Sequence, residues 1–363
     1  MNKNQNILIC PLEWGLGHAA RMIPIARKLQ ERNYNVIIGT GIEHQSIFRN
    51  ELPGLTYIDF PGFKPGYSRF LPQYIFLLLK TPLLFYHILD EHQRVKRIIN
   101  DNKIDIIISD NRFGLWSRSI KSVYVTHQPI IPFPAKLRFL EWTGILFHRF
   151  IIKKYSFCFI PDLPGDLNLS GRLTHGVKLP ENTRFMGILS RFSDGPHSRE
   201  NKFKFPHNTV ILSGPEPQRN ILRKKLIEIL KHREPPTVIL EGKPGSLSET
   251  STSENIISYN HLPADEMRDM ITGSTSIVTR SGYTSVMELI SLNCSALLIP
   301  TPGQTEQEYL AKYLSAKGWF STVSQSRLNA DTILPSGKAL WTSEIIDESR
   351  KLLEKALDDL LNQ

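Results

Sequence analysis

Cysteine is scarce in this sequence: only Cys10, Cys158 and Cys294 occur among 363 residues, and they stand far apart. Without a CxxC pair, neither a disulfide framework nor a cysteine zinc site is expected. No cluster of histidine and carboxylate residues has the spacing of metal ligands. Residues 109–111 (SDN) are the only weak match to an Asp-x-Asp metal motif. We therefore expect a reducing compartment, no bound metal and no resident cofactor.

Long apolar runs are also missing. No window reaches the roughly 18 uninterrupted apolar residues that a membrane-spanning helix needs. The opening residues, MNKNQNILIC, lead directly into a strand-like pattern without the features of a signal peptide. The expected location is the cytoplasm, including the inner face of the plasma membrane.

Positive charge is in excess, with a formal net charge of +9. Nucleic acid is not the expected partner, because no helix-turn-helix, zinc-finger or RNP-type motif is present. Instead, basic residues alternate with large apolar ones over residues 136–154, and residues 70–89 are strongly apolar. This pattern is typical of helices that lie on an anionic membrane surface, although core helices with solvent-facing Lys and Arg would look similar.

Short apolar strands alternate with helical segments in two series. The first has strands at 6–10, 35–39, 56–60, 104–110 and 122–127, with a helix over 22–32. The second has strands at 208–214, 237–242, 255–260, 274–282 and 295–302, with helices over 218–232 and 284–293. This alternation predicts two doubly wound, Rossmann-like α/β domains with parallel sheets, at 1–193 and 204–340, followed by a helix over 343–363. The polar, proline-containing segment 190–206 is interpreted as the linker near which the two domains join.

In such domains ligands bind at the carboxyl ends of the strands, so the expected site is a cleft that the two domains face. The stretch CPLEWGLGHAARMIPIARKL places Gly15, Gly17 and His18 directly after the first strand, with Arg21 one helical turn on. It is not the GxGxxG fingerprint, because position 20 is Ala, so no nicotinamide cofactor is expected. At a helix start, a neutral His18 is a candidate general base, and a capping or packing histidine is the structural alternative.

Two more polar residues end strands of the first series. Asp110 closes the strand over 104–110 and His127 closes the next one, so both are predicted at the same rim as His18. Asp110 would fix the tautomer of the histidine, or alternatively cap a turn. His127 is interpreted as a contact to the acceptor.

The second series repeats the strand–turn–helix pattern in TRSGYTSVMEL. Its backbone N–H groups would hold a diphosphate, and Glu288 would grip a ribose diol. Glu306 and Gln307 follow the next strand and are suited to sugar hydroxyls.

These segments resemble the GT-B glycosyltransferases, within the group related to the lipid II-forming N-acetylglucosaminyltransferase. The resemblance rests on GLGHAAR, on HQ after the fifth strand, and on RSGYTSVMEL with LLIPTPGQTEQEYLA. It implies a UDP-sugar donor, no metal, and a C-terminal helix that returns to the first domain. It also assigns donor-binding residues: Ser213, Gly214, Leu262, Arg280, Ser281, Gly282, Thr284, Ser285, Glu288, Glu306 and Gln307.

The sequence departs from that family at three places. The glycine-rich turn of the second domain is SGPEPQR, whose two prolines donate no hydrogen bond, so its phosphate contacts shrink to Ser213 and Gly214 with Arg219. Leu310 stands where the family has asparagine, and Arg21 where many relatives have proline. These changes argue against the peptidoglycan precursor as acceptor and leave the donor sugar open.

The predicted function is transfer of a sugar, GlcNAc or a related hexose, from a UDP-sugar to a hydroxyl of a lipid-linked or cell-envelope glycan, with inversion. His18 and Asp110 are the predicted catalytic residues, with Gly15, Gly17, Arg21 and His127 on the acceptor side. Two alternatives stay open. A UDP-sugar 2-epimerase would need more carboxylates than Asp110 and Glu13 in the first domain. A non-catalytic nucleotide-sugar or lipid-binding protein would not need both the His18 turn and the Glu288 helix.

Overall fold

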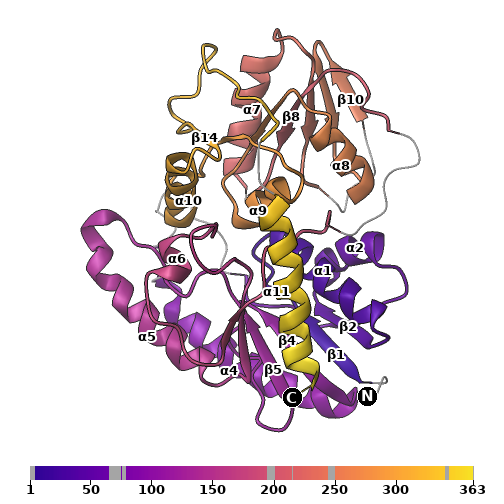
Figure 1. Ribbon diagram of the computed structural model, residues 1–363, viewed down its shortest axis with the longest axis vertical. Helices are drawn as coiled ribbons and strands as arrows, with labels where there is room; N and C mark the ends of the chain where they lie inside the picture. Colours follow the sequence, from indigo (N-terminus) through magenta and orange to yellow (C-terminus); the bar gives the residue numbers. More distant parts are fainter. Residues whose placement is uncertain are drawn as a thin grey trace. The chain divides into compact units, whose positions relative to one another are not determined.

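The computed structural model describes residues 5–64, 75, 79–193, 201–214, 216–243, 250–339 and 343–362. They divide into two compact units (Figure 1). The first holds the described residues up to 189 together with the C-terminal helix, and the second holds those of 190–339. Each unit is built on its own sheet, which confirms the predicted two-domain α/β fold class.

The sheet of the first unit has seven strands in the order β3-β2-β1-β4-β5-β6-β7, and every pairing is parallel. The strands are β1 (Asn6–Cys10), β2 (Asn35–Thr40), β3 (Thr56–Asp59), β4 (Ile104–Asp110), β5 (Lys121–Val125), β6 (Phe157–Ile160) and β7 (Thr183–Phe185). The chain runs outward from β1 to β3 and then returns to add β4 on the other side of β1. This reversal places the switch point of the sheet between β1 and β4, where ligands of such folds bind.

Helices cover this sheet because apolar side chains recur along one face of each. The helical elements are α1 (Leu16–Glu31), α2 (Ile42–Glu51), α4 (Thr81–Asp101), the 3-10 helix η1 (Ala135–Leu140), α5 (Glu141–Ile152) and α6 (Arg172–His175). Val95 and Ile99 of α4 pack against Leu8 and Ile107 of the strands. The end of α5 packs in the same way against β5 and β6.

The sheet of the second unit has the order β10-β11-β9-β8-β12-β13-β14. Its strands are β8 (Asn208–Ile211), β9 (Thr237–Leu240), β10 (Thr250–Ser253), β11 (Ile256–Tyr259), β12 (Ser276–Thr279), β13 (Leu297–Leu298) and β14 (Ser321–Thr322). Its helices are α7 (Gln218–Leu230), α8 (Ala264–Thr272), α9 (Tyr283–Ser291) and α10 (Thr305–Ala316). The edge strand β10 is antiparallel to β11, so this sheet is not parallel throughout. The switch point lies between β8 and β12.

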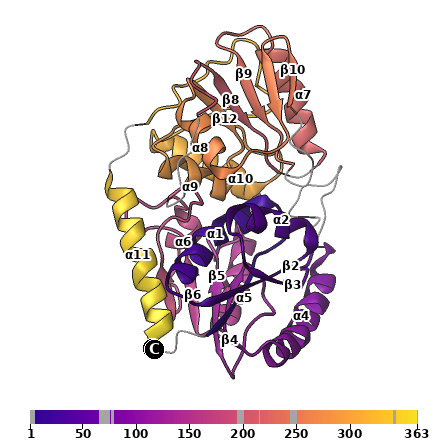
Figure 2. The same cartoon turned by 90° about the vertical axis from the view of Figure 1, so that its right-hand side faces the viewer.

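The last helix, α11 (Ser343–Asn362), belongs to the first unit and lies along it in both views (Figure 2). Arg32 at the end of α1 pairs with Glu354 and, at 2.8 Å, with Asp358. Lys121 Nζ donates to the carbonyl of Leu360 at 3.0 Å. The helix is therefore held by charge pairs and hydrogen bonds to residues more than 200 positions earlier in the chain.

The core of the first unit contains a histidine, His148 of α5, which is only 4% exposed. The rings of Phe113, Phe147 and Tyr124 surround it, and its Nδ1 has no hydrogen-bond partner among the described residues. Burial lowers the pKa of His148 from 6.5 to about 4, because the charged form would lose its hydration.

This histidine predicts a loss of stability in acid. In the unfolded chain His148 takes up a proton near pH 6.5, whereas in the folded protein it does so only near pH 4. Stability therefore falls as the pH drops through that interval, by about 3 kcal/mol at most. Replacing His148→Leu should flatten the fall in melting temperature between pH 7 and pH 4.5. The control His232→Gln, at an exposed histidine, should behave as the wild type does. An unchanged pH dependence in His148→Leu would contradict the prediction.

Candidate active site

The turn between β1 and α1 depends on Gly15. Its φ of +139° is disfavoured for residues with a side chain, and nothing lies within 4 Å of the position that a Cβ would take. The turn therefore leaves open space just before Gly17 and His18 in the first turn of α1. The side chain of His18 is 18% exposed, whereas its neighbours in the site are buried.

Asp110 contacts His18 from the carboxyl end of β4, the strand that pairs directly with β1 in the sheet. Its carboxylate is fully buried and accepts three contacts. His18 Nδ1 lies 2.9 Å from Oδ2, Arg21 Nε donates to Oδ2 at 3.0 Å, and Arg21 Nη2 donates to Oδ1. Burial by itself would raise the pKa of Asp110, but the charge of Arg21 and the contact with His18 lower it below its usual range. Asp110 is therefore ionised at neutral pH.

Arg21 joins the carboxylate to two histidines. Besides Asp110, its Nη2 lies 2.8 Å from His18 Nδ1, and its Nη1 lies 2.9 Å from His127 Nδ1. A guanidinium can only donate, so the Nδ1 of His127 must accept and its proton must sit on Nε2. His127 is thereby held as the tautomer whose Nε2–H is a donor.

The groups around His18 shift its pKa in opposite directions. Burial and the charge of Arg21 lower its pKa below 6.5, and the carboxylate of Asp110 only partly offsets this, so the ring is neutral at pH 7. When Nδ1–H donates to Asp110, Nε2 is left as an acceptor and can take a proton from a substrate hydroxyl. If Nδ1 accepted from Arg21 instead, Nε2 would carry the proton and could not act as a base. Asp110 is therefore the group that favours the catalytically useful tautomer.

Glu13, the other carboxylate near this turn, has a different position. Its Oε1 accepts from the hydroxyl of Thr40 at 2.9 Å and from the backbone N–H of Gly41 at 2.5 Å. Lys64 lies 3.5 Å from its other oxygen. Glu13 thus ties the end of β2 to the turn, and Asp110 is the carboxylate that contacts His18.

In the second unit, Gln307 in the first turn of α10 makes one hydrogen bond to the loop after β12 and one to the loop after β13. Ser281 Oγ donates to the backbone carbonyl of Gln307 at 2.8 Å, and Gln307 Oε1 accepts from the N–H of Thr301 at 2.9 Å. This leaves the amide NH₂ as the donor of the Gln307 side chain. Gly214, which follows β8, has a φ of +92° and lies close to Thr301. Residues predicted to bind the donor thus meet at the carboxyl edge of this sheet.

The remaining predicted donor residues surround this edge. Gly282 immediately precedes α9, whose first turn contains Thr284 and Ser285; Glu306 lies in the first turn of α10; and Leu262 is buried just before α8. A helix that starts at this edge directs the positive end of its dipole there, which favours an anion.

Arg280 connects three segments at the same edge of the sheet by hydrogen bonds. Its Nη1 donates to the carbonyls of Ile299 and Pro300, both at 3.2 Å, and its Nη2 donates to that of Gln218 at 2.9 Å. Burial lowers the pKa of Arg280 to about 10. These contacts connect β12, β13 and the start of α7.

The start of α7 already contains a negative charge. Glu216 Oε2 accepts from the N–H of Asn220 at 3.2 Å, and Oε1 pairs with Arg219 at 2.9 Å. A diphosphate placed there would meet this carboxylate, which agrees with the limited phosphate role inferred from the SGPEPQR segment.

Glu288 lies on the second turn of α9 and forms an ion pair that sequence analysis did not predict. Its Oε1 lies 2.9 Å from Arg191 Nε, and the two side chains are 10% and 11% exposed. Arg191 lies in the polar segment that was interpreted as a linker. The one feature of the sequence that could have indicated a role for it is a single positive charge directly after an apolar run. Burial and the nearby charge of Arg191 lower the pKa of His261, next to Leu262, to about 4.

Comparison with known proteins relates this chain to glycosyltransferases. Residues 240–355 match the glycosyltransferase family 28 C-terminal domain. Two curated relatives are UDP-N-acetylglucosamine--N-acetylmuramyl-(pentapeptide) pyrophosphoryl-undecaprenol N-acetylglucosamine transferases. The one from Staphylococcus carnosus is 24% identical over 88% of this chain and 85% of its own length. The one from Sulfurihydrogenibium sp. is 22% identical over 43% of this chain and about half (52%) of its own length. The chain is related to the lipid II-forming glycosyltransferases.

Solved structures show the GT-B fold. The glycosyltransferase of kitacinnamycin aligns with a TM-score of 0.62 at 11% identity, over 99% of this chain and 98% of that one. Acinetobacter baumannii MurG aligns with a TM-score of 0.55 at 13% identity, over 99% and 100%. The family 28 match spans the predicted donor residues from Leu262 to Gln307. The His18 cluster and Arg191 lie outside it.

Metal ligands are not gathered in either unit: the described part of the chain has no group of three or more His, Cys, Asp or Glu side chains that could hold an ion.

The charges around His18 predict opposite effects of two substitutions. Asp110→Asn removes the charge that raises the pKa of His18, so this pKa should fall further. Arg21→Gln removes a charge that lowers it, so the pKa should rise. The imidazole resonances of His18, followed by NMR against pH and identified with His18→Gln, give both shifts without relying on activity. Shifts in the same direction would contradict the described electrostatics.

Proposed function

We propose that this glycosyltransferase moves a sugar, GlcNAc or a related hexose, from a UDP-sugar to a hydroxyl of a lipid-linked or cell-envelope glycan, with inversion at the anomeric carbon. The observation that carries the proposal is the buried Asp110 carboxylate 2.9 Å from Nδ1 of a partly exposed His18. This pair lies at the switch point of one sheet, while the second unit from residue 240 onward matches the glycosyltransferase family 28 C-terminal domain.

The proposed reaction begins on the acceptor. Nε2 of His18 takes the proton of the acceptor hydroxyl, and the oxygen attacks the anomeric carbon of the donor. The bond between that carbon and the diphosphate oxygen breaks, and UDP leaves with the electron pair. Asp110 stabilises the imidazolium that forms. The open turn at Gly15 and Gly17 gives the acceptor access, and Nε2–H of His127 and the charge of Arg21 orient it.

The second unit binds the donor in this proposal. Glu288 accepts the two ribose hydroxyls, and the backbone of Leu262 contacts the uracil. Ser281, Gly282, Thr284 and Ser285 surround the diphosphate, with Ser213 and Gly214 beside them, and Glu306 and Gln307 bind the sugar. Helix N-termini and cationic side chains stabilise the leaving diphosphate, so no metal is required.

An anionic membrane surface is the second proposed partner, on the inner face of the plasma membrane. The structure has an exposed apolar face on α4, η1, α5 and the residues just before α4. Eight large side chains on it are at least half exposed: Leu79, Phe85, Tyr86, Leu89, Phe139, Trp142, Leu146 and Phe150. Phe85 and Phe147 are in ring contact at 5.9 Å, so the helices adjoin, and Lys136, Arg138 and Lys153 lie close by in sequence. No described helix has the length and apolar character to cross a bilayer. Residues 70–74 and 76–78 of the predicted apolar segment lie outside the described residues.

This face predicts salt-sensitive membrane binding. The wild-type protein should sediment with anionic liposomes at low salt and be released at high salt, because salt screens the charges. Replacing both Phe139→Ser and Trp142→Ser should weaken sedimentation by about 10-fold or more, because both side chains are exposed and would enter the interface. The matched control is Ile333→Ser, at an 85% exposed residue of the second unit. Equal, weak binding of neutral and anionic liposomes would contradict the proposal.

Donor binding should depend on the second unit, and the chemical step should depend on the first. Glu288→Ala removes charge-assisted hydrogen bonds to the ribose and should weaken UDP binding by about 10- to 150-fold. His18→Ala should leave UDP affinity nearly unchanged but lower turnover by about 100- to 10,000-fold. Calorimetric titration of UDP and turnover assays, both in EDTA, measure these effects. Glu228→Ala, at a 76% exposed carboxylate on α7, is the control.

The outcomes distinguish the alternatives. Unchanged UDP affinity in Glu288→Ala would remove the donor assignment, and equal losses in both variants would make His18 a donor or structural residue. Release of UDP that depends on an added acceptor indicates a transferase. Isomerisation of the sugar without an acceptor would indicate an epimerase.

A further inference from the structure

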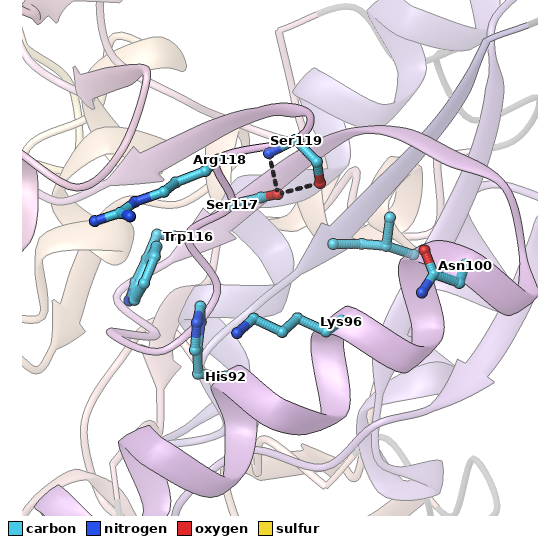
Figure 3. Close-up of a pocket in the computed structure, with 8 residues that line it drawn as sticks. His92, Lys96, Asn100, Trp116, Ser117, Arg118 and Ser119 are labelled. Carbon is cyan, nitrogen blue, oxygen red and sulfur yellow. Dashed lines mark hydrogen bonds between the residues drawn. The ribbon is translucent and has the colours of Figure 1, made fainter.

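The first unit contains a pocket that the proposed reaction does not use. Its cavity of about 430 Å³ lies between α4 and the segment that precedes β5 (Figure 3). The side chains of His92, Lys96, Ile99 and Asn100 come from α4; those of Trp116, Ser117, Arg118 and Ser119 come from the connecting segment. Since β5 begins at Lys121 and Ile106 pairs with it, this segment lies toward the amino end of the sheet, whereas His18 and Asp110 lie at the carboxyl end. The pocket is therefore a separate site.

The lining of this pocket is cationic. Lys96 and Arg118 each bear a positive charge, and none of the lining residues is acidic. Across the described ranges of the chain, neither of these two cations forms an ion pair with a carboxylate. Lys154 adds a third charge, with its Nζ 4.6 Å from the centre of the Trp116 ring. Cations gathered in a concave site without counter-charges favour an anionic ligand.

The hydroxyls of the pocket form a donor chain. Ser117 Oγ accepts from the backbone N–H groups of Ser119 and Ile120, at 3.2 and 3.3 Å. With its lone pairs engaged, its own proton is directed to Ser119 Oγ at 3.1 Å. The hydroxyl proton of Ser119 is then the end of the chain and can be donated to a ligand oxygen. Phosphate oxygens are acceptors, so this arrangement suits them.

Two residues of α4, on either side of Lys96, can accept hydrogen bonds. His92 Nδ1 lies 3.1 Å from the carbonyl of Gly114, which can only accept, so Nδ1 carries the proton and Nε2 is the acceptor of the neutral ring. The ring is held in place by stacking on Trp116, with centroids 3.7 Å apart. The amide oxygen of Asn100 is a second acceptor. Acceptors beside a cationic site call for a ligand that also carries hydroxyl groups.

We propose that this pocket binds a polyol phosphate, with the phosphate on Lys96, Arg118 and Ser119 and the hydroxyls on His92 and Asn100. The volume is within the range of small-molecule sites and exceeds what a lone phosphate fills. A polyol phosphate is presented by glycerophospholipid headgroups and also by soluble glycerol or sugar phosphates. Lys154 contacts both Trp116 of the pocket and Phe150 of the exposed apolar face, so a headgroup could reach the pocket from a membrane at that face.

The test compares two double variants with equal loss of charge. Lys96→Ala with Arg118→Ala removes the two cations that line the pocket, and Lys224→Ala with Lys355→Ala removes two exposed lysines elsewhere. Glycerol 3-phosphate and inorganic phosphate are titrated into each protein by calorimetry. The wild type and the control should bind glycerol 3-phosphate saturably, and the pocket variant about 10- to 100-fold more weakly. Inorganic phosphate should bind several-fold more weakly than glycerol 3-phosphate.

A second arm identifies the source of the ligand. The same proteins are sedimented with phosphatidylcholine vesicles containing phosphatidylglycerol, with and without glycerol 3-phosphate as competitor. Weaker binding by the pocket variant than by the control supports a lipid headgroup. Saturable binding of glycerol 3-phosphate with equal vesicle binding supports a soluble ligand. The proposal is overturned if no soluble probe binds saturably and both variants lose vesicle binding equally. Equal affinities for the two soluble probes would overturn the polyol assignment. None of these outcomes depends on glycosyl transfer.

Discussion

The organisation of the first unit depends on one buried carboxylate, Asp110. It stands at the end of β4 beside β1, and it receives Arg21 and His18 from the helix that follows β1. A buried charge is costly unless it is paired and hydrogen-bonded, and here one guanidinium both neutralises it and orients His127. The tautomer of His127 follows from this pairing, and Asp110 favours a proton on Nδ1 of His18. The same residues that make the switch point electrostatically stable therefore also orient the partly exposed ring of His18.

Much of this arrangement could be predicted from the sequence. The strands from β1 to β5 and the strands β8, β9 and β12 are apolar runs flanked by polar turns, and their order placed His18, Asp110 and the Ser281 loop at strand ends. The four-residue strand β6 (FCFI) and the three-residue β7 were missed, because a short aromatic run and a half-buried TRF segment carry no clear period. Helix α1 also begins earlier than predicted, at Leu16, and continues through Pro24.

Side-chain pairing was harder to predict. Arg21 and Asp110 are 89 positions apart, and only the strand order, with β4 beside β1, brings them together. Arg191 was overlooked because a polar, proline-containing segment was interpreted as a linker. Its ion pair with Glu288 means that a ribose diol bound there would have to share or replace a guanidinium that already holds the carboxylate. Such a pairing positions the carboxylate before any ligand binds.

The attachment of α11 has a consequence for synthesis of the protein. The helix belongs to the first unit, yet the whole second unit precedes it in the chain. During translation the ribosome therefore delivers the final piece of the first unit last, after the second unit has emerged. Until then the partners of α11, including Arg32 and Lys121, remain exposed on an incomplete surface. The first unit is thus translated first but completed last. A chaperone that binds the growing chain would meet this unit without α11.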